Sequence, residues 1–129
     1  MSQLAELEEQ IQAAADEGLD TVAETVVRAV GDDAAWDGLP DAAKQALAAN
    51  GAALVAEIRG GYPDVTVEQL RSLDVPTLLV GGEDSLLDYT EVIERTAAAI
   101  PSARVEWIPG GHLVDPAHPV VLRFLDELL

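Results

Sequence analysis

Two short strand-like segments in the second half of the chain, each followed by a pair of glycines, constrain its fold most. Val75–Val80 is an almost continuous apolar run that stops at Gly81-Gly82, which is typical of a parallel strand buried on both faces. Charged and apolar residues alternate over Arg104–Trp107, which predicts a half-buried strand nearer an edge. Asp88–Ile100, between them, has helical periodicity. The order strand, helix, strand therefore predicts a parallel β-α-β unit.

A final helix completes this part of the chain. Pro116 or Pro119 opens it, and apolar residues recur at helical spacing from Val120 to Leu128. We expect strands near 76–81 and 103–108 and helices near 88–99 and 117–128. The two strands should be adjacent and joined by a right-handed crossover. Residues 73–129 are thus predicted to form a β-α-β-α segment.

The first part of the chain, residues 1–72, reads as helices without a strand. Apolar residues at helical spacing predict helices near 2–17, 20–30, 40–49 and 52–59. We interpret Asp32–Gly38 as a turn-rich connection that holds Trp36, and Thr66 as the cap of a last short helical turn. The predicted fold class is α/β, with a helical segment over 1–72 and the β-α-β-α segment over 73–129.

The net charge of −17, from 24 acids against 7 bases, limits the classes of partner. So acidic a chain is a poor fit for nucleic acid or for an anionic membrane surface. Self-repulsion at this charge costs stability and decreases as salt screens it. The composition suits a halophilic, salt-rich cytoplasm, and high-GC bacterial genomes produce similar compositions.

Cysteine is absent, which excludes disulfides and thiolate metal sites. The first residues, Met1–Glu9, lack the basic region and apolar core of a signal peptide. No apolar run approaches the length of a membrane span. We therefore expect a cytoplasmic protein that neither enters a membrane nor binds nucleic acid.

The turns after the two predicted strands carry the residues with catalytic potential. Glu83 and Asp84 follow the first strand, and His112 follows the second. Loops that leave the carboxyl ends of neighbouring parallel strands emerge on the same side of the sheet. A histidine there could act as a general base, with a carboxylate raising its pKa. We expect the loops 81–88 and 109–115 to lie within side-chain reach of each other.

These turns resemble the C-terminal end of an α/β-hydrolase. Pro76–Glu83 (Pro-Thr-Leu-Leu-Val-Gly-Gly-Glu) and Ile108–His112 (Ile-Pro-Gly-Gly-His) occur together at the separation typical of that family. Trp36–Asn50, followed by Ala56–Arg59, is similar to the helices of its lid. The resemblance implies a lid-like segment over 1–72, and over 73–129 the last two strands with the catalytic acid and histidine. It also implies an esterase or related hydrolase with His112 as base.

The acid is not fixed by the resemblance. In the family it commonly follows a glycine as Gly-x-x-Asp; counted from Gly82 this position is Ser85, and counted from Gly81 it is Asp84. Asp84 is the preferred candidate, and the role could instead have passed to Asp88 or Asp115 or have been lost at Ser85.

The family's nucleophile motif, Gly-x-Ser-x-Gly, is absent from the sequence. Ser85 lacks the strand-turn-helix setting of a nucleophile and is a remote alternative. Without a nucleophile the histidine has nothing to activate, so we expect the chain to be inactive alone. It would then represent a natural half-protein, a truncation or an engineered fragment that starts inside the lid. A complementary N-terminal half would be its partner.

Two other interpretations stay open. A sheet of two strands leaves edges and an apolar face unpaired, which fits a non-catalytic module that associates with itself or another protein. An enzyme with a different nucleophile or a metal is the weaker alternative. No metal-ligand spacing joins Asp84, Asp88 or Asp115 with the two histidines, so we expect neither metal nor cofactor. His118 reads as a helix-start residue, and Trp36 and Trp107 read as core anchors.

Overall fold

The computed structural model describes residues 2–129, apart from the side chain of Leu87. The chain divides into two compact units: a helical unit up to Pro63 and a sheet unit, Asp64–Leu129. This division lies before the boundary at residue 72 predicted from the sequence. The cause is the short helix that follows Thr66, which packs on a helix of the sheet unit and so belongs with the strands.

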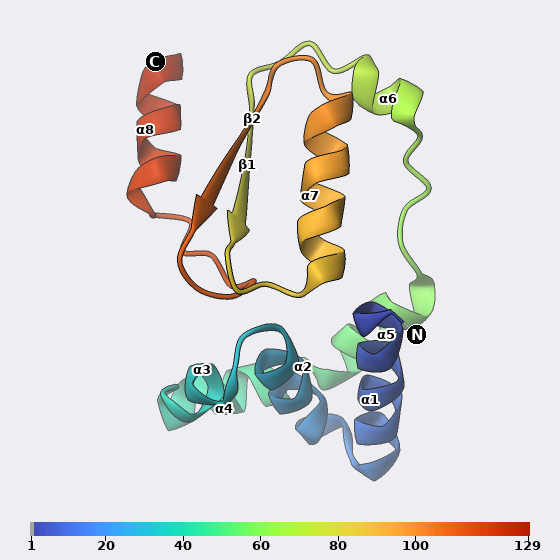
Figure 1. The fold of residues 1–129 in the computed structure, drawn as a ribbon. Helices are drawn as coiled ribbons and strands as arrows, with labels where there is room; N and C mark the ends of the chain where they lie inside the picture. Colours follow the sequence, from blue (N-terminus) through green and yellow to red (C-terminus); the bar gives the residue numbers. More distant parts are fainter. Residues whose placement is uncertain (1) are drawn as a thin grey trace. The chain divides into compact units, whose positions relative to one another are not determined.

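The helical unit consists of five α-helices and one 3₁₀ turn among its described residues (Figure 1). They are α1 (Gln3–Glu17), η1 (Leu19–Thr21), α2 (Val22–Val30), α3 (Asp33–Asp37), α4 (Asp41–Ala48) and α5 (Gly51–Gly60). No strand occurs within residues 2–72, as predicted. The helix α3 was not predicted. It forms because Asp32 caps it, its Oδ1 accepting a hydrogen bond from Ala35 N at 2.6 Å, and because Trp36 is buried.

The sheet unit alternates helices and strands. Its elements are α6 (Val67–Arg71), β1 (Thr77–Gly82), α7 (Leu87–Ala99), β2 (Ala103–Ile108) and α8 (Pro119–Leu128). The predicted β-α-β-α order is therefore confirmed. Thr66 caps α6 in a reciprocal capping box with Gln69, and Pro119 opens α8, with His118 as its cap.

The helical unit closes a core of its own. In α1 the residues that are buried, Leu7, Ile11 and Ala14, recur at helical spacing on one face. Val22 of α2 is fully buried, and Trp36 of α3 adds a large aromatic side chain. Further buried residues of this unit are Ala23, Val30 and Val55.

Close backbone approach and one charge cluster hold this unit together around the core. A Cβ at Gly51 would overlap the carbonyl oxygen of Leu19, so the first turn of α5 meets η1 where only glycine fits. Arg28 of α2 forms ion pairs with Glu24 at 2.8 Å, with Asp33 at 3.0 Å and with Asp37 at 2.8 Å. These charge-assisted contacts raise the pKa of Arg28 and join α2 to α3.

The strands of the sheet unit are parallel and adjacent, as predicted. Their register runs from Thr77 opposite Ala103 to Gly82 opposite Ile108. The helix α7, with 13 residues, is about 20 Å long, and the six-residue strands have about the same length. The helix therefore returns the chain over the full length of β1, so that β2 can start beside the first residue of β1.

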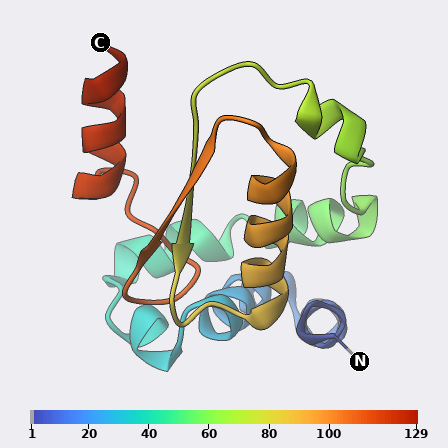
Figure 2. The same ribbon diagram turned by 45° about the horizontal axis from the view of Figure 1, so that its top comes forward.

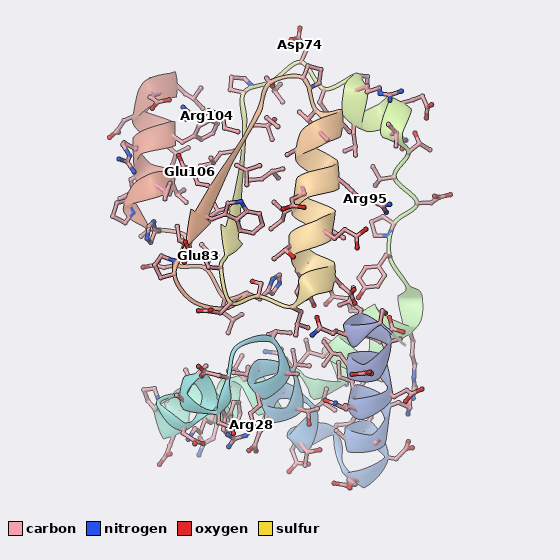
Figure 3. All side chains as sticks on the ribbon, in the orientation of Figure 1. Arg28, Asp74, Glu83, Arg95, Arg104 and Glu106 are labelled. Atoms are coloured by element: carbon pink, nitrogen blue, oxygen red, sulfur yellow. The ribbon has the colours of Figure 1, made fainter. Side chains whose placement is uncertain are left out.

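The two long helices of this unit lie on opposite sides of the strand pair, which both ribbon views show (Figures 1 and 2). On the α7 side, a Cβ at Gly81 would overlap the Trp107 ring and approach Ile93 Cδ1, so this layer is closely packed. On the α8 side, Val120 is buried and Arg104 of β2 pairs with Glu127 at 2.9 Å (Figure 3). The loops after β1 and β2 emerge between these two layers.

Candidate functional site

The loops that follow β1 and β2 meet at the carboxyl ends of the strands. Glu83 N donates a hydrogen bond to Ile108 O at 2.8 Å, and Asp84 N donates one to Gly110 O at 2.9 Å. Glu83 lies at this end of the strands, whereas Asp74 lies at the opposite end (Figure 3). The acidic loop and the histidine loop are thus neighbours joined through their backbones.

Glycines make this approach possible. A Cβ at Gly82 would overlap the carbonyl oxygens of both Gly111 and Gly110. Gly110 has φ = 108°, a conformation that other residues rarely adopt. A side chain at either position would separate the loops or strain the turn. The two glycine pairs noted in the sequence therefore have a definite role in closing the loops on each other.

His112 lies in the loop after β2, with its ring stacked on that of Tyr89. The ring centroids are 4.0 Å apart, and the planes differ by 16°. Tyr89 belongs to the first turn of α7, which starts at the same end of the sheet. His112 as a whole is exposed, but the part of the ring covered from water is harder to charge, and this desolvation lowers its pKa. The prediction that a carboxylate partner raises the pKa of His112 is therefore wrong in direction.

Asp84, the preferred acid, has an exposed side chain. Within residues 2–129, no hydrogen bond or ion pair joins its carboxylate to His112. The structure thus brings the two residues into neighbouring, hydrogen-bonded loops without joining their side chains.

The other two candidates for the acid, Asp88 and Asp115, lie in the first turn of α7 and in the turn before α8. Asp115 Oδ1 accepts a hydrogen bond from Ala117 N at 2.9 Å, which orders the turn before α8. Asp88 is half-buried in the first turn of α7, where a negative charge interacts favourably with the helix dipole. Asp88 is also the immediate neighbour of Tyr89, so it lies near the stacked pair along the chain.

Ser85 occupies the place three residues after Gly82. Its hydroxyl oxygen is buried and has no hydrogen-bond partner among the described residues, a costly arrangement for a polar group. Its backbone N donates to Gly82 O at 3.1 Å in a turn. No described residue other than glycine has a positive φ, so residues 2–129 contain no strained serine turn of the nucleophile-elbow type.

Tyr89 is the residue of this site that the sequence analysis missed. The signal that could have found it is positional: in a β-α-β unit, the first turn of the crossover helix starts at the carboxyl end of the first strand. An aromatic residue there lies beside the loop of the second strand. The sequence predicts that the two loops meet, and it predicts no role for the first turn of α7 between them.

Metal sites and membrane-spanning helices are absent from the described residues. No group of three histidine, aspartate or glutamate side chains within residues 2–129 is arranged to hold a metal ion. Among the same residues, no helix has the length and apolar character needed to cross a membrane.

The comparisons with known proteins assign this chain to no family. No family model, no curated protein and no solved structure matches this chain.

Proposed function

We propose that this chain carries the acid- and histidine-bearing C-terminal part of an α/β-hydrolase of the esterase type, with His112 as general base and Asp84 as the acid that orients it. The observation that supports this most is the pair of backbone hydrogen bonds that ties the Glu83-Asp84 turn to the residues before His112. The parallel β1–β2 pair and its loops at one end also fit the family's last two strands.

The protonation state of the histidine suits this role. A general base must be neutral before it accepts a proton, and desolvation lowers the pKa of His112. The neutral ring therefore predominates around pH 7. Tyr89 holds one face of the ring, which fixes its orientation at the loop. What residues 2–129 lack is a serine in a strained turn, so the nucleophile would have to come from polypeptide outside residues 1–129.

Complementation tests this proposal. The chain would be co-expressed with a polypeptide encoded beside it or in frame with it that contains Gly-x-Ser-x-Gly, and p-nitrophenyl ester hydrolysis would be measured. We expect background rates for the chain alone and hydrolysis in the complex, abolished by His112→Gln. His118→Gln is the matched control, since His118 caps α8 and lies outside the site. Hydrolysis that survives His112→Gln would refute the assignment of the base.

An NMR titration tests the assignment of the acid separately. Asp84→Asn removes a negative charge from the loop next to His112, so the histidine pKa should fall further. Asp74→Asn is the control, because Asp74 lies at the opposite end of the strands (Figure 3). If the His112 curves of wild type and Asp84→Asn coincide, Asp84 is not the partner.

A second candidate function, a non-catalytic association module, is favoured by the distribution of apolar side chains. In α8, Leu122, Leu125 and Leu128 are each close to half exposed. A face of this kind is commonly covered by another protein surface. Light scattering at low and high salt tests self-association, which screening should strengthen because both copies are acidic. A strict monomer at both salt concentrations would argue against it.

A further inference from the structure

A groove between α6 and α7 brings two arginines together in a strongly acidic chain. It is lined by Val67 and Arg71 of α6 and by Arg95, Ala98 and Ala99 of α7, and its volume is ≈ 490 Å³. This volume lies in the size range of small-molecule sites, and the groove is shallow and largely open to solvent. All five lining residues belong to the sheet unit, and none belongs to the loops that carry His112 and Asp84.

The fold fixes both walls of the groove. The capping box of Thr66 and Gln69 sets the start of α6, and Arg71 follows in its last turn. Ile93 of α7 faces the sheet, where it approaches Gly81. Arg95 is labelled in Figure 3 on the side of α7 that faces away from the strands. Each helix thus contributes one arginine and at least one apolar side chain to the lining of the groove.

The two groove arginines are engaged less firmly than Arg28 and Arg104. Arg28 has three carboxylate partners within 3.0 Å, and Arg104 has Glu127 at 2.9 Å. Arg95 has one partner, Glu91, at 3.4 Å, and both side chains are largely exposed, at 81% and 62%. For Arg71 no ion pair occurs among residues 2–129. Their hydrogen-bond donors are therefore available to a ligand.

We propose that this groove binds a small organic oxyanion, a carboxylate or a phosphate monoester, that carries a compact apolar group. A guanidinium matches the geometry of both oxyanions with paired hydrogen bonds. Val67, Ala98 and Ala99 would contact the apolar group. The five lining residues include two arginines and no acid, in a chain that has 24 acids and only 7 bases. The ligand would displace Glu91 from Arg95.

The experiment is an NMR titration of the full chain with phenyl phosphate and with benzoate, which separate the two oxyanion types. Benzyl alcohol tests the apolar group alone, and inorganic phosphate tests the charge alone. We expect saturable shifts at the amides of Val67, Ala98 and Ala99 with at least one aromatic anion, and weaker binding of both comparison compounds.

Substitutions distinguish a specific binding site from non-specific attraction of anions. Arg71→Gln and Arg95→Gln should each raise the Kd about tenfold or more. Arg123→Gln is the matched control, because Arg123 is an exposed arginine of the same unit that does not line the groove. Equal affinity in all three variants, or shifts that do not saturate, would overturn the proposal. Binding of an acidic peptide without binding of either aromatic anion would also overturn it. Unchanged thermal midpoints of the variants show that they are folded.

Discussion

The helical unit and the sheet unit differ most in where their large apolar side chains lie. In the helical unit the buried apolar residues are Leu7, Ile11, Ala14, Val22, Ala23, Val30, Trp36 and Val55, and the exposed large ones are Leu19 and Tyr62. In the sheet unit the described buried set shrinks to Ile100, Ile108 and Val120. Its exposed set is longer: Val65, Val67, Leu73, Val75, Val92, Leu113, Leu122, Leu125, Leu128 and Leu129.

This difference shows that regular secondary structure does not by itself bury apolar side chains. The sheet unit has a regular parallel ladder, capped helices and joined loops, but these satisfy backbone groups and remove little apolar surface from water. Burial of apolar surface provides about 25 cal/mol per Å², so a unit that leaves these side chains exposed gains less from folding. The helical unit thus removes more of its large apolar side chains from water than the sheet unit does.

The largest expected effect comes from a cavity in the helical core. Ile11 is 2% exposed, and Ile11→Ala should lower the free energy of unfolding by about 3 kcal/mol. Leu122 of the sheet unit is 47% exposed, and Leu122→Ala should change it by less than about 0.5 kcal/mol. Chemical denaturation of both variants measures the contrast. A large loss for Leu122→Ala would show that α8 is covered in solution and would narrow the difference between the units.

Glycine substitutions should act on one unit at a time. Gly51→Ala in the helical unit and Gly82→Ala in the sheet unit both drive a Cβ into a carbonyl oxygen, so each should cost about 2 kcal/mol. Thermal unfolding followed by residue-resolved NMR should show each loss confined to its own unit.

The control for both substitutions is Gly60→Ala. Gly60 is the last residue of α5 and has open space around it, so alanine should be neutral or stabilise by up to about 1 kcal/mol. A destabilisation of both units by either Gly51→Ala or Gly82→Ala would mean that the units unfold together.

Salt should affect the two units alike. Each unit carries 12 acids, against 3 bases in the helical unit and 4 in the sheet unit. Raising KCl from about 0.1 M to about 2 M should therefore raise both thermal midpoints, by roughly 5 °C for each 1 kcal/mol of repulsion removed. Calorimetry at the two concentrations measures this. A fall or no change would mean that the acids are compensated locally, as Arg28 compensates its three carboxylates.

The smallest expected effect is the pH dependence that His112 adds to the sheet unit. Burial lowers the pKa of His112 in the folded chain, so the unfolded chain binds its proton first as the pH falls. Above the unfolded pKa of about 6.5, His112 contributes nothing to the pH dependence of stability. Below that pH, protonation of His112 increasingly lowers the free energy of unfolding. His112→Gln should therefore lose less stability than wild type between about pH 8 and about pH 5. Identical pH profiles would contradict this.

Tyr89→Ala tests the cause of this effect. Removing the stacked ring should expose His112 to water and return its pKa toward the ordinary value, as followed by NMR.

Much of this fold follows from local sequence signals, and the misses have physical causes. The strands were predictable because an apolar run and an alternating run are each bounded by glycine or proline. The five-residue α3 was missed because it is too short for periodicity, and its existence depends on the Asp32 cap and the burial of Trp36. The two compact units divide before α6 because α6 packs against α7, and no local pattern encodes that packing.

The candidate site was predictable only at the level of the backbone. The meeting of the two loops follows from parallel topology alone. The direction of the His112 pKa does not, because it depends on whether an aromatic ring or a carboxylate lies against the imidazole. The choice among Asp84, Asp88 and Asp115 depends in the same way on side-chain orientation.

The parallel pairing of β1 with β2 has a consequence for the order of folding. Thr77 and Ala103 lie far apart in the sequence, so the chain must lose the entropy of closing the intervening loop before the ladder forms. If α7 forms first, its length shortens that search. The helical unit has long-range closures of its own, since α5 contacts both α1 and η1. Until the ladder forms, the apolar Leu78–Val80 segment is unpaired, and strand-to-strand aggregation competes with native pairing.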